Sequence, residues 1–135
     1  MASPREALKK VDLFSELSQR QLGKLASKFK ERRFKEGETV VQQGRMSGVG
    51  FFVVQDGEAT VNVAGRAVGK LGPGDHFGEL ALIAERERTA TVKAKTALTC
   101  LEIPIWDFRE FVKNDSNAAW KLLQHVTRTL LDQRK

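Results

Sequence analysis

Apolar residues follow a helical spacing near both ends of the chain and a strand-like spacing between them. A first helix is predicted after Ser18, which forms a capping-box pattern with Gln21. Its apolar residues recur three or four positions apart: Leu22, Leu25, Ala26 and Phe29. Two final helices are predicted beyond Pro104, the first near residues 105–112 and the second from about Ser116.

The central zone contains short β-prone runs at 38–42, 51–54, 59–63, 66–68, 89–94 and 97–103. Ten of the eleven glycines lie between Gly37 and Gly78, mostly in turns that separate these runs. Turns at such short intervals are typical of antiparallel sheets. We therefore predict a mainly β fold, an eight-stranded antiparallel, jelly-roll-like β-roll over about 30–103. It carries an N-terminal helix, a short helix inside the roll and two C-terminal helices over about 105–133.

Length and composition are those of an ordinary globular domain. A chain of 135 residues can bury a sizeable core, and 41% hydrophobic with 30% charged residues excludes wholesale disorder. The lone Cys100 excludes a disulfide framework and a Cys-rich zinc site. There is neither a long apolar run nor a secretory leader after Met1. We expect a single cytoplasmic domain over 1–135 that does not contact a membrane.

The net charge of +6 suggests nucleic acid as a partner, because basic domains bind phosphates. Residues 1–36 carry ten basic and five acidic side chains, residues 37–104 carry seven and eight, and residues 105–135 carry six and four. The positive charge therefore lies on the flanking helices. These zones contain no recognisable nucleic-acid motif, so nucleic acid is only the third hypothesis for the partner.

The segment 72–92, with the sequence GPGDHFGELALIAERERTATV, has the residue types of an anion site. A turn leads into a predicted short helix over 77–84. The first amide groups of that helix, near Leu80 and Ala81, lack intrahelical acceptors and favour a phosphate. Arg88 is close enough in sequence for its guanidinium to clasp two phosphate oxygens at the same place.

Gly78 and Glu79 make this anion site more specific. Gly78 lets a ligand approach the backbone closely. The carboxylate of Glu79 would repel an anion unless it accepted a hydrogen bond from a hydroxyl group of the ligand. A sugar next to a phosphate satisfies both requirements, so the segment indicates a nucleotide.

The same segment resembles the phosphate-binding cassette of the cyclic-nucleotide-binding domain family. The run Phe77-Gly-Glu-Leu-Ala-Leu-Ile83, four loop residues and then Arg88-Thr-Ala-Thr-Val92 match the family pattern in residue type and spacing. The order of helices and strands is also similar, over roughly Leu13 to Leu130. The sequence departs from the family in its charged loop, where Arg86 is expected to face solvent.

The resemblance implies a 3′,5′-cyclic nucleotide as the ligand, with no further cofactor. Glu79 would accept the ribose 2′-hydroxyl beside Gly78, and Arg88 would pair with the phosphate. The other implied contacts lie at the phosphate and at the base: Leu80, Ala81, Thr89 and Ala90, then Val61 and Val68. A hydroxyl donor at Thr89 is sufficient for the phosphate alone, so we expect cAMP ahead of cGMP.

Two functions remain open from the sequence. The first is a regulatory sensor that binds the nucleotide and signals through its C-terminal helices. The alternative is a degenerate, ligand-free interaction or dimerisation module with the same fold. Catalysis is not expected, because no nucleophile stands in a motif with a base. A metal site is not expected either, because His76 and His125 lie 49 residues apart.

The last helix carries the remaining partner hypothesis. A seam of apolar residues runs along it: Ala119, Leu123, Val126 and Leu130, with Leu122 beside them. This seam either packs on the β-core of the same chain or pairs with a second copy in a homodimer. Trp106 and Trp120 are interpreted as core or interface anchors, with Trp120 also a candidate cap for the base. His76 is interpreted as a rim residue and His125 as a helix-surface residue.

Overall fold

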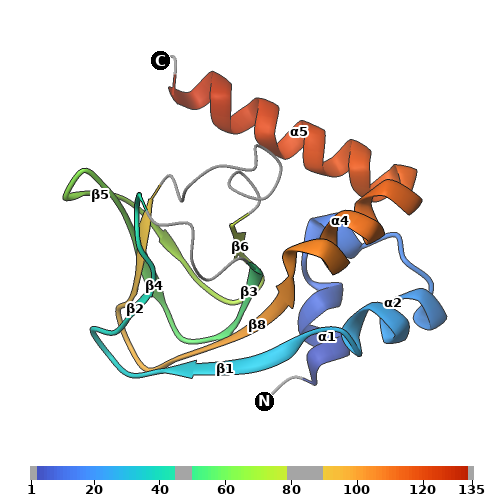
Figure 1. The fold of residues 1–135 in the computed structure, drawn as a ribbon, viewed down its shortest axis with the longest axis horizontal. Coiled ribbons are helices and arrows are strands. Elements are labelled where there is room, and N and C mark those ends of the chain that lie inside the picture. The colour runs from blue at the N-terminus through green and yellow to red at the C-terminus, as the bar shows by residue number, and fades with distance from the viewer. Residues whose placement is uncertain (1–2, 45–49, 79–89, 134–135) are drawn as a thin grey trace.

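The computed structural model describes residues 3–44, 50–78 and 90–133. In Figure 1 the strands form a roll, the N-terminal helices and α4 lie beside one of its sheets, and α5 crosses one end. The helices are α1 (Pro4–Lys9), the 3-10 helix η1 (Asp12–Phe14), α2 (Gln19–Ala26), α4 (Ile105–Asn114) and α5 (Ser116–Gln133). None of the described helices combines the length and the apolar content needed to cross a bilayer.

Eight described strands form two antiparallel sheets of four strands each. One sheet has the order β1 (Lys30–Phe34), β8 (Leu98–Pro104), β3 (Gly50–Asp56) and β6 (His76–Phe77). The other has the order β2 (Thr39–Val41), β7 (Thr91–Ala94), β4 (Ala59–Val63) and β5 (Arg66–Leu71). The predicted mainly β, eight-stranded antiparallel fold is confirmed. Phe77, the first residue of the short helix predicted over 77–84, belongs to β6 instead; residues 79–84 lie outside the described residues.

The start of α2 follows from its capping residues. The Oγ of Ser18 accepts a hydrogen bond from the backbone N–H of Gln21 at 3.1 Å, and the Oε1 of Gln21 accepts one from the N–H of Ser18 at 2.9 Å. The predicted capping box is therefore confirmed. The helix ends at Ala26, so Phe29 reaches the core from the connection to β1. The sequence reading missed α1, which is capped by Ser3.

Strand β3 is buried on both faces, which explains its uninterrupted apolar sequence. Phe51 and Val53 point into a helix-side core, and Phe52 and Val54 point into an inter-sheet core. The helix-side core contains Ala7, Leu8, Val11, Leu13, Phe14, Leu17, Leu22, Leu25, Phe29, Phe51, Val53, Leu101, Ile103, Phe108 and Leu122. The inter-sheet core contains Phe34, Val41, Phe52, Val54, Ala59, Phe77, Val92, Ala94, Leu98 and Cys100.

Aromatic rings join β3 to the helices. The ring of Phe51 stacks on that of Phe108 in α4 with a centroid distance of 4.2 Å and an interplanar angle of 8°. Phe51 also meets Phe14 of η1 edge-on at 6.2 Å, and Phe14 meets Phe111 of α4 at 5.5 Å. These contacts fix both helical segments against the same residue of the sheet.

Cys100 lies in the inter-sheet core and is fully buried. Burial raises the pKa of its thiol to about 12, with Arg32 opposing and Glu102 reinforcing the shift. The thiol is therefore protonated at neutral pH and serves as a small apolar side chain.

We predict that Phe51→Ala lowers the free energy of unfolding by about 3–5 kcal/mol, because it removes a buried ring that packs against both helical segments. Leu131→Ala is the control, since Leu131 is 54% exposed, and its effect is expected to stay within about 0.5 kcal/mol. Urea unfolding followed by circular dichroism measures both. Equal losses for the two variants would contradict the two-sided role of β3.

Candidate functional site

The structure describes four of the nine predicted site residues. Gly78 follows β6, Ala90 precedes β7, Val61 lies in β4 and Val68 in β5. The other five lie outside the described residues: Glu79, Leu80, Ala81, Arg88 and Thr89. The described residues therefore define where the predicted cassette leaves the roll and where it returns.

The departure point is β6, which is held by the turn before it. The Oδ2 of Asp75 accepts a hydrogen bond from the backbone N–H of Gly72 at 2.8 Å, and Gly74 adopts a φ of +93°. The backbone of the turn is tied to β3 as well, because the N–H of Val54 donates to the carbonyl of Asp75 at 2.9 Å. Gly78 comes directly afterwards with a φ of +101°, a conformation that favours glycine.

The two side chains of β6 point into different cores. The ring of Phe77 stacks on that of Phe52 in the inter-sheet core, with a centroid distance of 4.9 Å. The ring of His76 lies 5.2 Å from that of Phe51 and 4.6 Å from that of His125 in α5. The strand that leads to the predicted cassette is thus in direct contact with the last helix.

This contact changes the interpretation of both histidines. Neither is an isolated surface residue, since each is half-buried and their rings meet although they are 49 positions apart in the sequence. Among the described residues no group of three or more His, Cys, Asp or Glu side chains is arranged to hold a metal ion. The histidine pair is therefore a packing contact between β6 and α5.

The return point is β7, where Gln43 and Thr91 connect three segments. The backbone N–H of Gln43 donates to the Oγ1 of Thr91 at 3.0 Å, and the Oε1 of Gln43 accepts from the N–H of Ala64 at 2.8 Å. Ala64 and Gly65 both have positive φ, 53° and 81°, as a two-residue hairpin turn of type I′ requires. Gln43 therefore ties the β4–β5 hairpin to the strand that follows the cassette.

Val61 and Val68 occupy different environments. Val61 pairs with Val92 of β7 and with Gly69 of β5, and it packs against the inter-sheet core. The β4–β5 register shifts at this point, so that Asn62 pairs with Ala67 and Val68 is left as the extra residue of a β-bulge. The side chain of Val68 is 61% exposed. Lining of a base by either residue remains a prediction.

The predicted seam of α5 packs on the core of this chain only in part, and its pairing with a second copy remains a prediction. Ala118 and Leu122 are buried, and Val126 packs against the helix-side core. Leu123 and Leu130, which the seam grouped with Val126, are exposed instead. They belong to an exposed stripe that lies beside the packed residues on the helix surface: Trp120, Leu123, Leu130 and Leu131.

The two tryptophans do not lie in the core of this chain. Trp106 in α4 is 65% exposed and Trp120 in α5 is 61% exposed. The interpretation of these residues as core anchors was therefore wrong. A role at an interface remains a prediction for both residues, as does a role over the base for Trp120.

Three contacts were missed by the sequence reasoning: the His76–His125 pair, the Gln43–Ala64 bond and the Gln43–Thr91 bond. Each joins residues that are more than twenty positions apart, and no local sequence pattern predicts such a contact. The one available signal was the turn pattern at Ala64-Gly65. It predicts a hairpin but does not indicate that Gln43 bonds to it.

A family model described as "Cyclic nucleotide-binding domain" matches residues 31–115, which span both ends of the predicted cassette and most of the roll. The chain belongs to the cyclic nucleotide-binding domain family. The family resemblance read from the sequence is thereby confirmed.

Individual members show the same likeness. The chain is 42% identical over 92 residues to a cAMP-dependent protein kinase regulatory subunit of Schizosaccharomyces pombe, covering 67% of this chain and 22% of that protein. It is 35% identical over 98 residues to a cGMP-dependent protein kinase of Eimeria tenella, covering 73% of this chain and 9% of that protein. The matched segments thus span less than a quarter of these relatives.

A solved structure shows the likeness of the fold. The regulatory domain of Toxoplasma gondii PKA, crystallised with cAMP, superposes with a TM-score of 0.80 at 27% sequence identity. The superposition covers 91% of this chain and 48% of that one. Both sheets and the helices around them therefore follow the architecture of this cyclic nucleotide-binding family member.

We predict that Gln43→Ala lowers the free energy of unfolding by about 0.5–1.5 kcal/mol, because it leaves the backbone N–H of Ala64 without its acceptor. Gln42→Ala is the matched control, since its side chain is exposed and makes no hydrogen bond within the described residues. Urea unfolding compares the two variants. Amide exchange at Ala64 is expected to accelerate only in Gln43→Ala, and unchanged exchange there would overturn the assignment of Gln43 as the hairpin tie.

Proposed function

We propose that this domain binds a 3′,5′-cyclic nucleotide, with cAMP preferred over cGMP, and transmits binding through α4 and α5. The observation that carries the proposal is the family match over 31–115, which contains the run from Phe77 to Val92 in full. The structure supports it by holding both described ends of that run. Gly78 follows one sheet, and Ala90 precedes a strand of the other.

The proposed contacts are those implied by the cassette residues. Glu79 accepts the ribose 2′-hydroxyl, Arg88 pairs with the cyclic phosphate, and the amides near Leu80, Ala81 and Ala90 complete the phosphate site with the Thr89 hydroxyl. Gly78 leaves room beside the ribose. Val61 and Val68 lie toward the base on the β4–β5 hairpin, where Val68 offers exposed apolar surface.

Preference for cAMP rests on two supports. The regulatory subunit of Schizosaccharomyces pombe is named for cAMP, and the Toxoplasma gondii regulatory domain was crystallised with cAMP. The Eimeria tenella relative is named for cGMP, so the family relationship alone leaves both nucleotides open. The hydroxyl of Thr89 is sufficiently explained as a donor to the phosphate. The proposal therefore needs no contact between Thr89 and a guanine base.

Transmission to the helices is supported by three ring contacts. His76 of β6 meets His125 of α5 at 4.6 Å, and Phe51 of β3 carries both the ring of His76 and that of Phe108 in α4. A ligand that alters the backbone after Gly78 would therefore act on a strand that contacts α5 directly and α4 through Phe51. Only contacts that differ between the free and bound states can shift the equilibrium between them.

The second candidate function is a ligand-free interaction or dimerisation module. The exposed stripe of α5, formed by Trp120, Leu123, Leu130 and Leu131, is the observation that favours it, because such residues are usually covered at interfaces. A homodimer through this stripe is compatible with nucleotide binding and would also exist without it. Sedimentation in the presence and absence of cAMP shows whether the homodimer forms and whether it depends on the nucleotide.

We predict that Arg88→Leu weakens cAMP binding roughly 30- to 900-fold, because about 2–4 kcal/mol is lost when a bound phosphate loses its charge-assisted partner. The matched control is Arg86→Leu, which removes the same charge two positions earlier and is expected to leave binding nearly unchanged. Isothermal titration calorimetry with cAMP and cGMP measures both.

The same titrations decide between the two functions. Absence of heat with either nucleotide at high micromolar concentration would reject the sensor in favour of the interaction module. An equal loss in the two arginine variants would instead reject Arg88 as the specific phosphate partner. Circular dichroism of each variant shows that the fold is retained.

We predict that cAMP changes the intrinsic tryptophan fluorescence of the protein. The chain contains two tryptophans, and both are exposed residues of the C-terminal helices, so the signal reports on α4 and α5 alone. Trp106→Phe and Trp120→Phe assign the change to one helix. His125→Ala is expected to reduce the change while calorimetry still detects binding. Binding without any change in emission would contradict transmission through these helices.

A further inference from the structure

A groove of about 280 Å³ lies between α2 and α4, apart from the predicted nucleotide site. It is lined by Leu17, Gln21, Lys24, Leu25, Lys28, Asp107, Glu110, Phe111, Asn114 and Asp115. No residue predicted to contact the nucleotide belongs to this set. The groove is therefore separate from the predicted nucleotide site.

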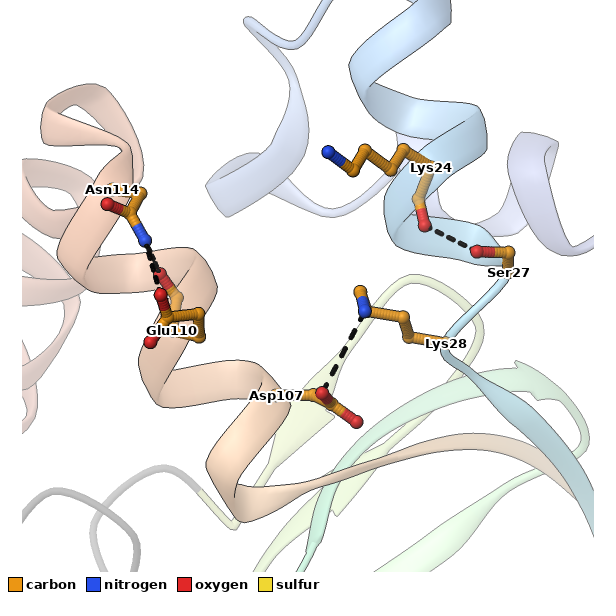
Figure 2. Close-up of polar contacts among 6 residues, drawn as sticks. All are labelled: Lys24, Ser27, Lys28, Asp107, Glu110 and Asn114. Atoms are coloured by element: carbon orange, nitrogen blue, oxygen red, sulfur yellow. Dashed lines mark hydrogen bonds and ion pairs between the residues drawn. The ribbon is translucent and has the colours of Figure 1, made fainter.

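The two walls of the groove carry opposite charges. Lys24 and Lys28 lie on α2 and just beyond it, and Asp107 and Glu110 lie on α4, as Figure 2 shows. Among the described residues a single long ion pair joins the two walls, in which the Nζ of Lys28 lies 3.9 Å from the Oδ1 of Asp107. The ammonium group of Lys24 makes no hydrogen bond or ion pair with any residue that the structure describes.

Glu110 is held along its own helix and does not reach across to Lys24. Its Oε1 accepts a hydrogen bond from the Nδ2 of Asn114 at 3.0 Å, and its backbone carbonyl accepts another from the same nitrogen at 2.8 Å (Figure 2). A carboxylate has further acceptor capacity beyond one such bond. The middle of the groove thus has a cation on one wall and an available carboxylate on the other.

The floor of the groove is apolar and firm. Leu17 and Leu25 are buried members of the helix-side core. Phe111 is partly buried, and its ring is fixed edge-on against that of Phe14 at 5.5 Å. An apolar side chain placed on this floor would therefore meet a surface that is already packed.

We propose that this groove binds an amphipathic helix from a protein partner. One or two apolar side chains of that helix rest on Leu17, Leu25 and Phe111. Acidic residues on one flank face Lys24 and Lys28, and basic residues on the other flank face Asp107 and Glu110. This proposal does not depend on nucleotide binding.

Shape and charge together favour a helix as the occupant. A third helix laid along two helices places apolar residues in the seam between them, with charged residues on each side of that seam, as in helix-in-groove recognition and coiled coils. The volume of about 280 Å³ lies just below the usual range for drug-sized ligands and suits inserted side chains. A purely acidic or purely basic partner would face one wall of its own sign.

The test uses three fluorescein-labelled helical peptides with the same leucines and different flanks. One carries glutamates on one flank and lysines on the other, one carries glutamates on both, and one carries lysines on both. Their anisotropy is titrated with the full chain at low salt. We expect the mixed peptide to bind about fivefold more tightly than either uniform peptide. Each exposed ion pair contributes only a small part of this difference in affinity.

Variants of the two walls make the test specific. Lys24→Glu leaves the wall with Lys28 without net charge opposite an acidic wall, and it should shift the preference toward the lysine peptide. Glu110→Lys leaves the wall with Asp107 without net charge opposite a basic wall, and it should shift the preference toward the glutamate peptide. Lys35→Glu and Glu36→Lys are the matched controls, because they change the same charges on the exposed connection between β1 and β2.

The outcomes separate clearly. Preferences that follow the groove variants and not the controls would support the proposal. It would be overturned by binding that is equal for the three peptides, by the same shift in the control variants, or by no binding at millimolar protein.

Discussion

The two-sided burial of β3 is the constraint on which the rest of the fold depends. Consecutive side chains of a strand point to opposite faces, so Phe51 must enter the helix-side core when Phe52 enters the inter-sheet core. A shift of one residue would exchange these two sets of contacts. The same strand holds β6, since Phe52 stacks on Phe77 and Phe51 lies against His76. The start of the cassette region is thereby fixed relative to both cores.

The topology places the two ends of that region in different sheets. β6 belongs to the sheet that the helices cover, and β7 belongs to the opposite one, where Gln43 and Thr91 join β2, β7 and the β4–β5 hairpin. A ligand held between Gly78 and Ala90 would thus act on both sheets at once. Packed cores have few alternative arrangements. A displacement of β6 would therefore also displace the rings that contact it, those of Phe51, Phe52 and His125.

Local signals were sufficient for most of the fold but not for the arrangement of the site. The Ser18–Gln21 capping box, the glycine turns and the apolar run of β3 each depend on neighbouring residues, and each was readable. The meeting of His76 with His125 depends on how β6 and α5 pack, which no local spacing encodes. The bulge at Val68 arises from strand register. The seam of α5 was misread because apolar residues surround much of that helix, and only packing decides which are buried.

The packed and exposed apolar residues of α5 bear on how the helix could respond to a ligand. Its packed face contributes Leu122 and Val126 to the helix-side core, while Trp120, Leu123, Leu130 and Leu131 remain exposed. Complete burial of one large apolar side chain is worth about 1.5–3 kcal/mol. Covering the exposed stripe would therefore release free energy comparable to that lost by uncovering the packed face. A helix with exposed apolar residues beside its packed ones can be moved by a modest difference in ligand affinity between its two positions, whereas a helix whose apolar residues are all packed would resist displacement.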